Sequence, residues 1–283
     1  MSLIGVQPLK KIIKLTLQTG WIKKEPGFDY PVNLLIIAKP ESGKTQAVTY
    51  KIPGTYTTTN ITQAVMVSKI FPIIENDGLK YLIIPDILNA IEKGRTTAKG
   101  FINMTKSLIE EGISNLDTFN LRTTRTYEPP IKCGMITATT TESYNGYYNP
   151  LTQRTEGGLK HQWKRIGLLS RFVPFSYSYG IEKIKGIYLY MEKQEPTKAV
   201  VDGPPIRRIK RAIYGEPTLF SQLEIISMKT GDSIGCYGVR LQRSLQDLVR
   251  ANAMINGRDT LTQEDINEII HLSNWINYDF NPM

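Results

Sequence analysis

The stretch VNLLIIAKPESGKT, Val32 to Thr45, decides the fold. Its apolar part, Leu34 to Ala38, has the length of one buried strand and is bounded by residues that favour turns. Ser42-Gly43-Lys44-Thr45 then forms a tight loop, and from Thr45 onward the pattern can continue as a helix. A strand, a tight loop and a helix in this order are the context in which phosphate-binding loops occur.

The loop matches the pattern G-x-x-x-x-G-K-[ST] except at its first position, where Ala38 replaces glycine. Backbone N–H groups at the start of a helix favour an anion. Lys44 would reach the β- and γ-phosphates, and the Thr45 hydroxyl would complete the shell of Mg²⁺. A chance SGKT in a surface loop is the alternative, and the preceding strand argues against it. The predicted ligands are ATP and Mg²⁺, and the predicted contacts are Lys39, Pro40, Glu41, Ser42, Gly43, Lys44, Thr45 and Gln46.

The composition is that of an ordinary globular chain, with 283 residues, 41% hydrophobic residues and 22% charged residues. No apolar run approaches the roughly 20 residues that span a bilayer, so no membrane contact is expected. The two cysteines, Cys133 and Cys236, form no metal or disulfide pattern, which favours a reducing cytoplasm, or the interior of a host cell for a viral chain. The net charge of +9 suits a polyanionic partner but does not establish one.

A second apolar segment, Lys80 to Asp86 (KYLIIPD), is predicted to be a strand that ends in a carboxylate. In phosphate-loop proteins such a carboxylate, here Asp86, holds Mg²⁺ directly or through water. Asp86 is also a good cap for a helix starting at Ile87, and both roles are compatible. Many ATPases place glutamate directly after this Asp, but here the residue is Ile87. Glu92 and Glu142 are the alternative water-activating bases, so nucleotide binding is a safer prediction than turnover.

Lys132 to Thr141 (KCGMITATTT) is predicted to be a further strand that ends in hydroxyl groups. A polar side chain there, beside the phosphate loop, would bond the γ-phosphate or the attacking water. Thr139 and Thr140 are the candidates, and Thr140 is the one chosen. Residues 143–160 are predicted to be a loop, followed by a short helix containing Trp163.

The segment Asp117 to Glu128 (DTFNLRTTRTYE) alternates β-branched and basic residues and is expected to form a hairpin. Arg122 and Arg125 near its tip suit contact with a DNA backbone. The alternative is an exposed edge strand whose charges prevent aggregation. The residues favour neither interpretation over the other.

The segment Gly167 to Tyr179 (GLLSRFVPFSYSY) leads from a helix end into the fifth predicted strand. Together with the motifs above, it resembles AAA+ ATPases, and LLSRF is similar to the arginine-finger segment of minichromosome maintenance helicases. The resemblance implies that Arg171 reaches the γ-phosphate bound by a neighbouring subunit, with Arg165 as the fallback. An ordinary surface salt bridge of Arg171 is the alternative.

The C-terminal part carries a second resemblance to the same family. Arg240 to Asn256 (RLQRSLQDLVRANAMIN) has the period of an amphipathic helix, and a second helix starts near Thr262 with a capping box. These helices resemble the small helical lid of AAA+ proteins. The resemblance places the sensor-2 arginine, which contacts phosphate from the lid, at Arg243, with Arg250 as the next candidate.

We therefore expect an α/β P-loop NTPase of the AAA+ type, with a five-stranded parallel sheet and a helical lid. The expected domains are a core over residues 1–180, a basic linker over 181–217 and the lid over 218–283. The expected function is an ATP-dependent motor that forms a homo-oligomeric ring or filament, acts on DNA and works with protein partners. One alternative is a protein-remodelling chaperone with Tyr147 and Tyr148 as pore aromatics, and another is an ATP-dependent assembly switch.

Overall fold

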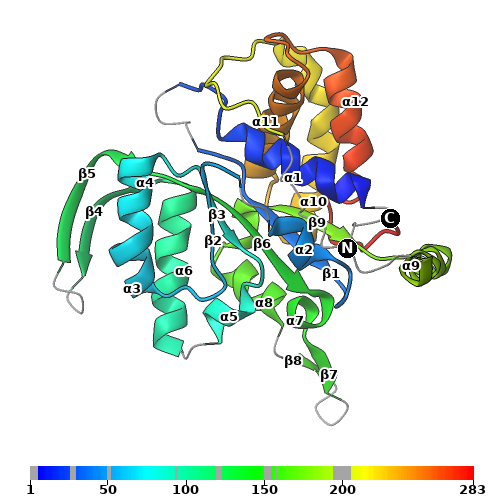
Figure 1. The fold of residues 1–283 in the computed structure, drawn as a ribbon, viewed down its shortest axis with the longest axis horizontal. Helices are drawn as coiled ribbons and strands as arrows, with labels where there is room; N and C mark the ends of the chain where they lie inside the picture. Colours follow the sequence, from blue (N-terminus) through cyan, green and yellow to red (C-terminus); the bar gives the residue numbers. More distant parts are fainter. Residues whose placement is uncertain are drawn as a thin grey trace.

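The computed structural model describes residues 6–25, 30–49, 52–92, 95–118, 123–149, 154–156, 158–193 and 205–283. Its centre is the predicted five-stranded parallel sheet, which is thereby confirmed. The spatial order is β2-β3-β6-β1-β9, so the strand before the phosphate loop lies between β6 and β9 (Figure 1). The bounds are β1 (Leu34–Ala38), β2 (Thr55–Thr57), β3 (Tyr81–Ile84), β6 (Gly134–Thr140) and β9 (Val173–Tyr177).

The strands of this sheet are apolar on both faces because both faces are covered. Along β1, Leu34 and Ile36 face one core cluster, whereas Leu35 and Ile37 face the other. The first cluster contains helix α1 (Gln7–Thr19) and the C-terminal helices. The second contains α4 (Phe71–Asp77), α6 (Arg95–Ile109) and α8 (Leu159–Arg165). The predicted helices on both faces are therefore confirmed.

The C-terminal helices do not form a core of their own. They are α10 (Glu224–Ser233), α11 (Val239–Ile255) and α12 (Gln263–Leu272), preceded by the 3₁₀ helix η4 (Pro217–Leu223). Residues of α11 and α12 share one apolar cluster with α1 and with one face of the sheet. The capping box predicted at Thr262 is present, with Asp265 as its reciprocal partner. This helical region is therefore joined to the sheet through α1.

Two segments differ from the sequence-based expectation, and a third agrees with it. Residues 143–160, predicted to be a loop, include the end of α7 (Thr141–Asn145) and a small hairpin of β7 (Tyr147–Asn149) and β8 (Arg154–Glu156). The predicted linker over 181–217 begins with a 13-residue helix, α9 (Ile181–Lys193). The predicted Arg-bearing hairpin exists as β4 (Ile113–Thr118) and β5 (Thr123–Ile131), and it pairs outside the main sheet.

The remaining helical segments are short, and they are α2 (Lys44–Val48), α3 (Gln63–Val65), the π-helical turn η1 (Met66–Ile70), α5 (Leu88–Ile91) and the 3₁₀ turn η3 (Leu169–Arg171). Among the described residues, no helix has both the length and the apolar character needed to cross a membrane.

Candidate nucleotide-binding site

The phosphate loop joins β1 to α2 at the carboxyl edge of the sheet. Gly43 adopts φ of 80°, a left-handed conformation that costs glycine nothing, and it caps α2. Lys44, the first residue of α2, is only 7% exposed, and its Nζ donates to the Lys39 carbonyl at 2.9 Å. Because α2 has only five residues, the positive potential comes from the loop N–H groups and Lys44 and not from a long helix dipole.

Two tyrosines that the sequence did not single out hold this loop in place. The hydroxyls of Tyr177 and Tyr179 donate to the Ser42 carbonyl, at 3.0 and 2.7 Å. Burial raises the pKa of both phenols, so both remain protonated donors at neutral pH. Since Tyr177 ends β9, these bonds tie the last strand of the sheet to the phosphate loop.

Two carboxylates act electrostatically on Lys44. Burial lowers the pKa of Lys44, and the charges of Asp86 and Glu142 act in the opposite direction. Asp86 follows β3, and its Oδ1 accepts the N–H of Leu88, the first residue of α5, at 3.1 Å. The N-cap position of that helix is Ile87, so Asp86 bonds the start of the helix from the residue before the N-cap. Glu142 lies in the first turn of α7, directly after β6. The structure thus gathers one cation and two carboxylates from three segments at this edge.

Glu142 and Glu92 were equal candidates for the water-activating base, and the structure separates them. Glu142 is exposed and contributes to the potential at Lys44. Glu92 is the C-cap residue after α5 and is not among the charges that shift the pKa of Lys44. Glu142 is therefore the better placed of the two.

The residue after Asp86 has a structural role. Ile87 is 1% exposed, belongs to the apolar cluster on the α6 side of the sheet, and donates its N–H to the Ala138 carbonyl. A carboxylate side chain at this position would be buried against apolar neighbours. The backbone path after β3 therefore excludes a glutamate here.

Replacing Ile87 with glutamate is expected to destabilise the fold by about 3 kcal/mol or more, because a charge or an unpaired carboxyl enters the core. Denaturant unfolding followed by circular dichroism measures the change. The control Ile87→Val removes one methylene and should cost only about 1 kcal/mol. An Ile87→Glu protein as stable as the wild type with faster ATP hydrolysis would contradict this assignment.

The two strand-end threonines differ in the hydrogen bonds of their hydroxyl groups. The Thr140 hydroxyl caps α7, accepting the Ser143 N–H and donating to the Ser143 Oγ at 2.8 Å. The Thr139 Oγ1 is buried and has no hydrogen-bond partner among the described residues. Thr139 is therefore the hydroxyl with unused bonding capacity at this strand end.

Arg171 lies at the other edge of the sheet. It ends η3, two residues before Val173, which is the register partner of Leu34 at the start of β1. Leu34 and Ala38 are four residue steps apart along β1, so the start of the strand lies about 13 Å from the phosphate loop at its end. Arg171 Nε forms an ion pair with Glu110 Oε2 at 2.5 Å, although the two groups are not aligned as a hydrogen bond, and its guanidinium donates to the Gly167 carbonyl.

Two further arginines lie beside Arg171. Arg240 donates to the other oxygen of Glu110, so this carboxylate binds two guanidinium groups. Arg243 lines the same cavity as Arg171 and Glu110, between α11 and the amino edge of the sheet. The structure thus brings Arg171 and Arg243 together, and it does not bring either of them to Lys44 of the same chain.

The fallback arginines have other surroundings. Arg165 ends α8 and is exposed. Arg250 bonds Asp247 at 3.0 Å and lies over the Phe220 ring. Neither of them lines the cavity that contains Arg171 and Arg243.

Asn33 bonds the backbone of Arg171, a role that no sequence pattern indicated. Its side chain is buried and donates to the carbonyls of Arg171 and Ile109, at 3.1 and 3.3 Å, while its Oδ1 accepts the Met135 N–H. One amide therefore links the start of β6, the end of α6 and the arginine-bearing turn.

The predicted DNA-contact arginines belong to the β4–β5 hairpin. Arg125 is exposed on β5, opposite Leu116, whereas Arg122 lies outside the described residues. The predicted pore aromatics Tyr147 and Tyr148 lie in β7, but their side chains are outside the described part of the structure.

The residues present fit a nucleotide with a divalent cation. A desolvated lysine in a glycine-capped loop lies within electrostatic reach of a strand-end carboxylate, Asp86, and Thr45 follows this lysine at the start of α2. The described residues hold no cluster of three or more His, Cys, Asp or Glu side chains that would bind a metal without other ligands.

In comparisons with known proteins, no family model matches the chain, and no curated protein matches it.

Proposed function

We propose that this chain is an ATPase of the AAA+ type that assembles head to tail and acts on DNA. The observation that carries the proposal is the separation of Lys44 and Arg171 at opposite edges of one sheet. A head-to-tail contact presents the arginine edge of one copy to the phosphate loop of the next, and such contacts close into rings or extend into filaments. The arginines then complete a site that one chain only half contains.

The residues of the loop edge divide the chemistry between them. Lys44 and the loop N–H groups would hold the phosphates, and Thr45 with Asp86 would hold Mg²⁺, whose charge neutralises the phosphate oxygens when bound. Glu142 would accept the proton of the attacking water, and Thr139 or Thr140 would orient it. Arg171 and Arg243 of the neighbouring copy would stabilise the charge that develops on the transferred phosphate.

DNA as the polymer substrate is supported by charge. The chain has a net charge of +9, and Arg125 is exposed on a hairpin outside the main sheet. Lysines also gather at the amino edge of the sheet, in a cavity lined by Lys23, Lys24, Lys80, Lys132 and Lys210. Four glutamates line the same cavity, so it is not uniformly basic.

The test is the ATPase rate of the purified protein with and without single- and double-stranded DNA at two salt concentrations. Arg125→Ala is expected to weaken DNA stimulation and to lower its salt dependence by about one counterion, because one phosphate contact is lost. Lys106→Ala, a charge removed from α6, is the matched control. If DNA stimulates the ATPase rate of Arg125→Ala as much as that of the wild type, Arg125 and its hairpin do not contact DNA.

The assembly switch remains the second candidate function, and Ile87 is the observation that favours it. Because that position is committed to the core, hydrolysis depends on a carboxylate from elsewhere. Tight ATP binding, ATP-dependent assembly and a rate that DNA does not change would favour the switch over the motor.

A further inference from the structure

Helix α9 presents an exposed apolar surface in the part of the chain that the structure describes. Ile181, Ile184 and Tyr188 follow an i, i+3, i+7 spacing and share one face, and all three are exposed, Ile181 to 73%. Leu189 extends the exposed apolar surface. No other described helix or strand makes extensive contact with α9, which projects from the body in Figure 1. Since an isolated helix of this length is only marginally stable in water, a partner is expected to cover it.

A second exposed apolar surface lies on the C-terminal helices. It consists of Ile225, Met228, Tyr237 and Val239, and we call it the α10 patch. These residues adjoin because Gly238 packs against α10, where an added Cβ would lie 2.1 Å from the Ser227 carbonyl oxygen. Tyr237 is 91% exposed and Ile225 76%.

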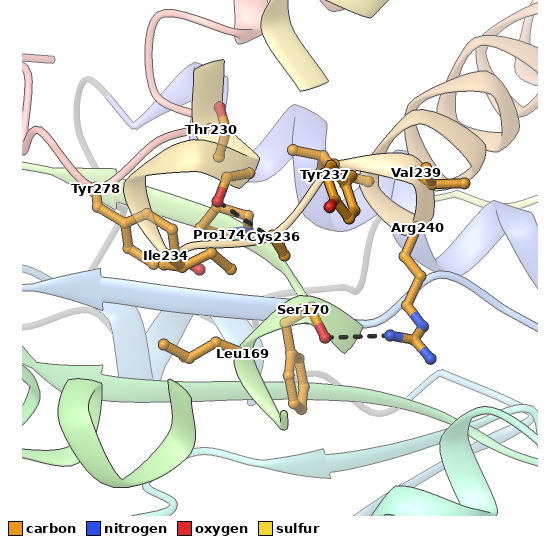
Figure 2. A pocket seen from close by; sticks show the side chains of 14 residues that line it. Leu169, Ser170, Pro174, Thr230, Ile234, Cys236, Tyr237, Val239, Arg240 and Tyr278 are labelled. Atoms are coloured by element: carbon orange, nitrogen blue, oxygen red, sulfur yellow. Dashed lines mark hydrogen bonds between the residues drawn. The ribbon is translucent and has the colours of Figure 1, made fainter. Parts of the chain in front are cut away.

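A cavity of about 170 Å³ opens beside this patch. Figure 2 shows Tyr237, Val239 and Arg240 on one side of it and Leu169 and Ser170 on the other. Arg240 donates to the Ser170 hydroxyl across it. The lining is mostly apolar, which suits an apolar side chain from outside.

The two surfaces lie beside the two halves of the proposed ATP site. Helix α9 begins two residues after Tyr179, whose hydroxyl bonds Ser42 of the phosphate loop. The α10 patch borders Arg240, which shares the Glu110 carboxylate with Arg171. A head-to-tail contact that presents Arg171 to the phosphate loop of the next copy therefore brings the α10 patch toward the α9 of that copy.

We propose that α9 of one copy docks against the α10 patch of its neighbour, with Ile184 and Tyr188 over the cavity beside Tyr237. The proposal rests on the inter-subunit ATP site proposed above. The position of the two surfaces favours a second copy as the occupant, because α9 lies next to the phosphate loop and the α10 patch next to the Arg171 cluster. The exposed charges of α9 are mixed in sign, since Glu182 and Lys185 pair with each other. A lipid surface would select basic residues alone around an apolar stripe.

The test compares two carboxylates on the same helix. Ile184→Glu places a charge in the apolar stripe, whereas Gly186→Glu places it on another side of α9, where an added Cβ meets nothing within 4 Å. Sedimentation velocity with ATP is expected to show self-association weakened about tenfold or more by Ile184→Glu and unchanged by Gly186→Glu. Combining Ile184→Glu with Tyr237→Lys is expected to restore part of the association, because opposite charges then face each other.

Cross-linking tests the contact without a disruptive substitution. The variants carry Cys236→Ser, which removes the partly exposed native thiol. The other native cysteine, Cys133, is buried, and burial raises the pKa of its thiol to about 12, so it does not compete for disulfide formation. Ile184→Cys protein mixed with Tyr237→Cys protein is expected to give a reducible dimer under mild oxidation, and either variant alone is not.

Several outcomes would overturn the docking proposal. Unchanged association of Ile184→Glu together with no cross-link would do so, as would binding of α9 to anionic vesicles that Ile184→Glu abolishes without changing self-association. If either of these results is obtained and ATP hydrolysis nevertheless requires arginines from a neighbouring copy, only the docking proposal fails and the proposed function stands. If hydrolysis is independent of assembly, the proposed function fails instead.

Discussion

A mixture of Lys44→Ala protein and Arg171→Ala protein is expected to hydrolyse ATP although neither variant does so alone. Lys44→Ala removes the phosphate cation, and Arg171→Ala removes a charge that is typically worth about 10³-fold or more in rate. In a head-to-tail assembly, the intact loop of one variant meets the intact arginine of the other. Random mixing in equal amounts should leave about a quarter of the sites complete.

The same mixture distinguishes the two possible origins of the arginine. If Arg171 served the phosphate loop of its own chain, every chain in the mixture would carry one defect and no activity would return. Arg165→Ala is the matched control, because Arg165 is exposed on the preceding helix and lies outside the Arg171 cavity. Since Arg171 also pairs with Glu110, the melting temperature of each variant is needed to exclude unfolding.

Glu142→Gln is expected to lower kcat by about 10²- to 10⁴-fold while leaving ATP affinity within a few-fold of the wild type. The amide keeps the size of the side chain but cannot accept the proton of the attacking water. Any small change in ATP affinity is expected to be an increase, because removing a negative charge near Lys44 lessens competition with the phosphates. Single-turnover hydrolysis and equilibrium binding of a fluorescent ATP analogue separate the two effects.

Glu92→Gln is the control for this assignment, since Glu92 was the equal candidate on sequence grounds and is the C-cap residue of a different helix. Its expected rate is that of the wild type. A normal rate in Glu142→Gln together with a slow Glu92→Gln would reverse the assignment. Normal rates in both would place the base outside these two residues.

Where the sequence predicted the fold well, the signals were local. Leu34 to Ala38 is buried on both faces of the sheet, so an unbroken apolar run of five residues was enough to identify β1. The capping box at Thr262 and the glycine turn at Gly43 depend on residues within one turn of each other.

Prediction from the sequence failed where a helix has little contact with the rest of the described chain and where strands are short. Helix α9 carries Gly186 in its interior and begins a segment rich in Lys and Arg, so its composition did not predict a helix despite the apolar spacing. The hairpin of β7 and β8 has three residues in each strand, too few for a period-2 pattern to appear.

By itself, the sequence determined the strand–loop–helix unit around Lys44, the carboxylate Asp86 after its strand and the arginine before the last strand. Only the tertiary structure decided that Arg171 and Arg243 share one cavity at the edge opposite Lys44, and that Glu142 rather than Glu92 affects the lysine. The physical reason is the separation along the chain of the residues that interact. A turn or a cap depends on neighbours a few residues away, whereas strand order and register decide which edge of a sheet each strand end occupies.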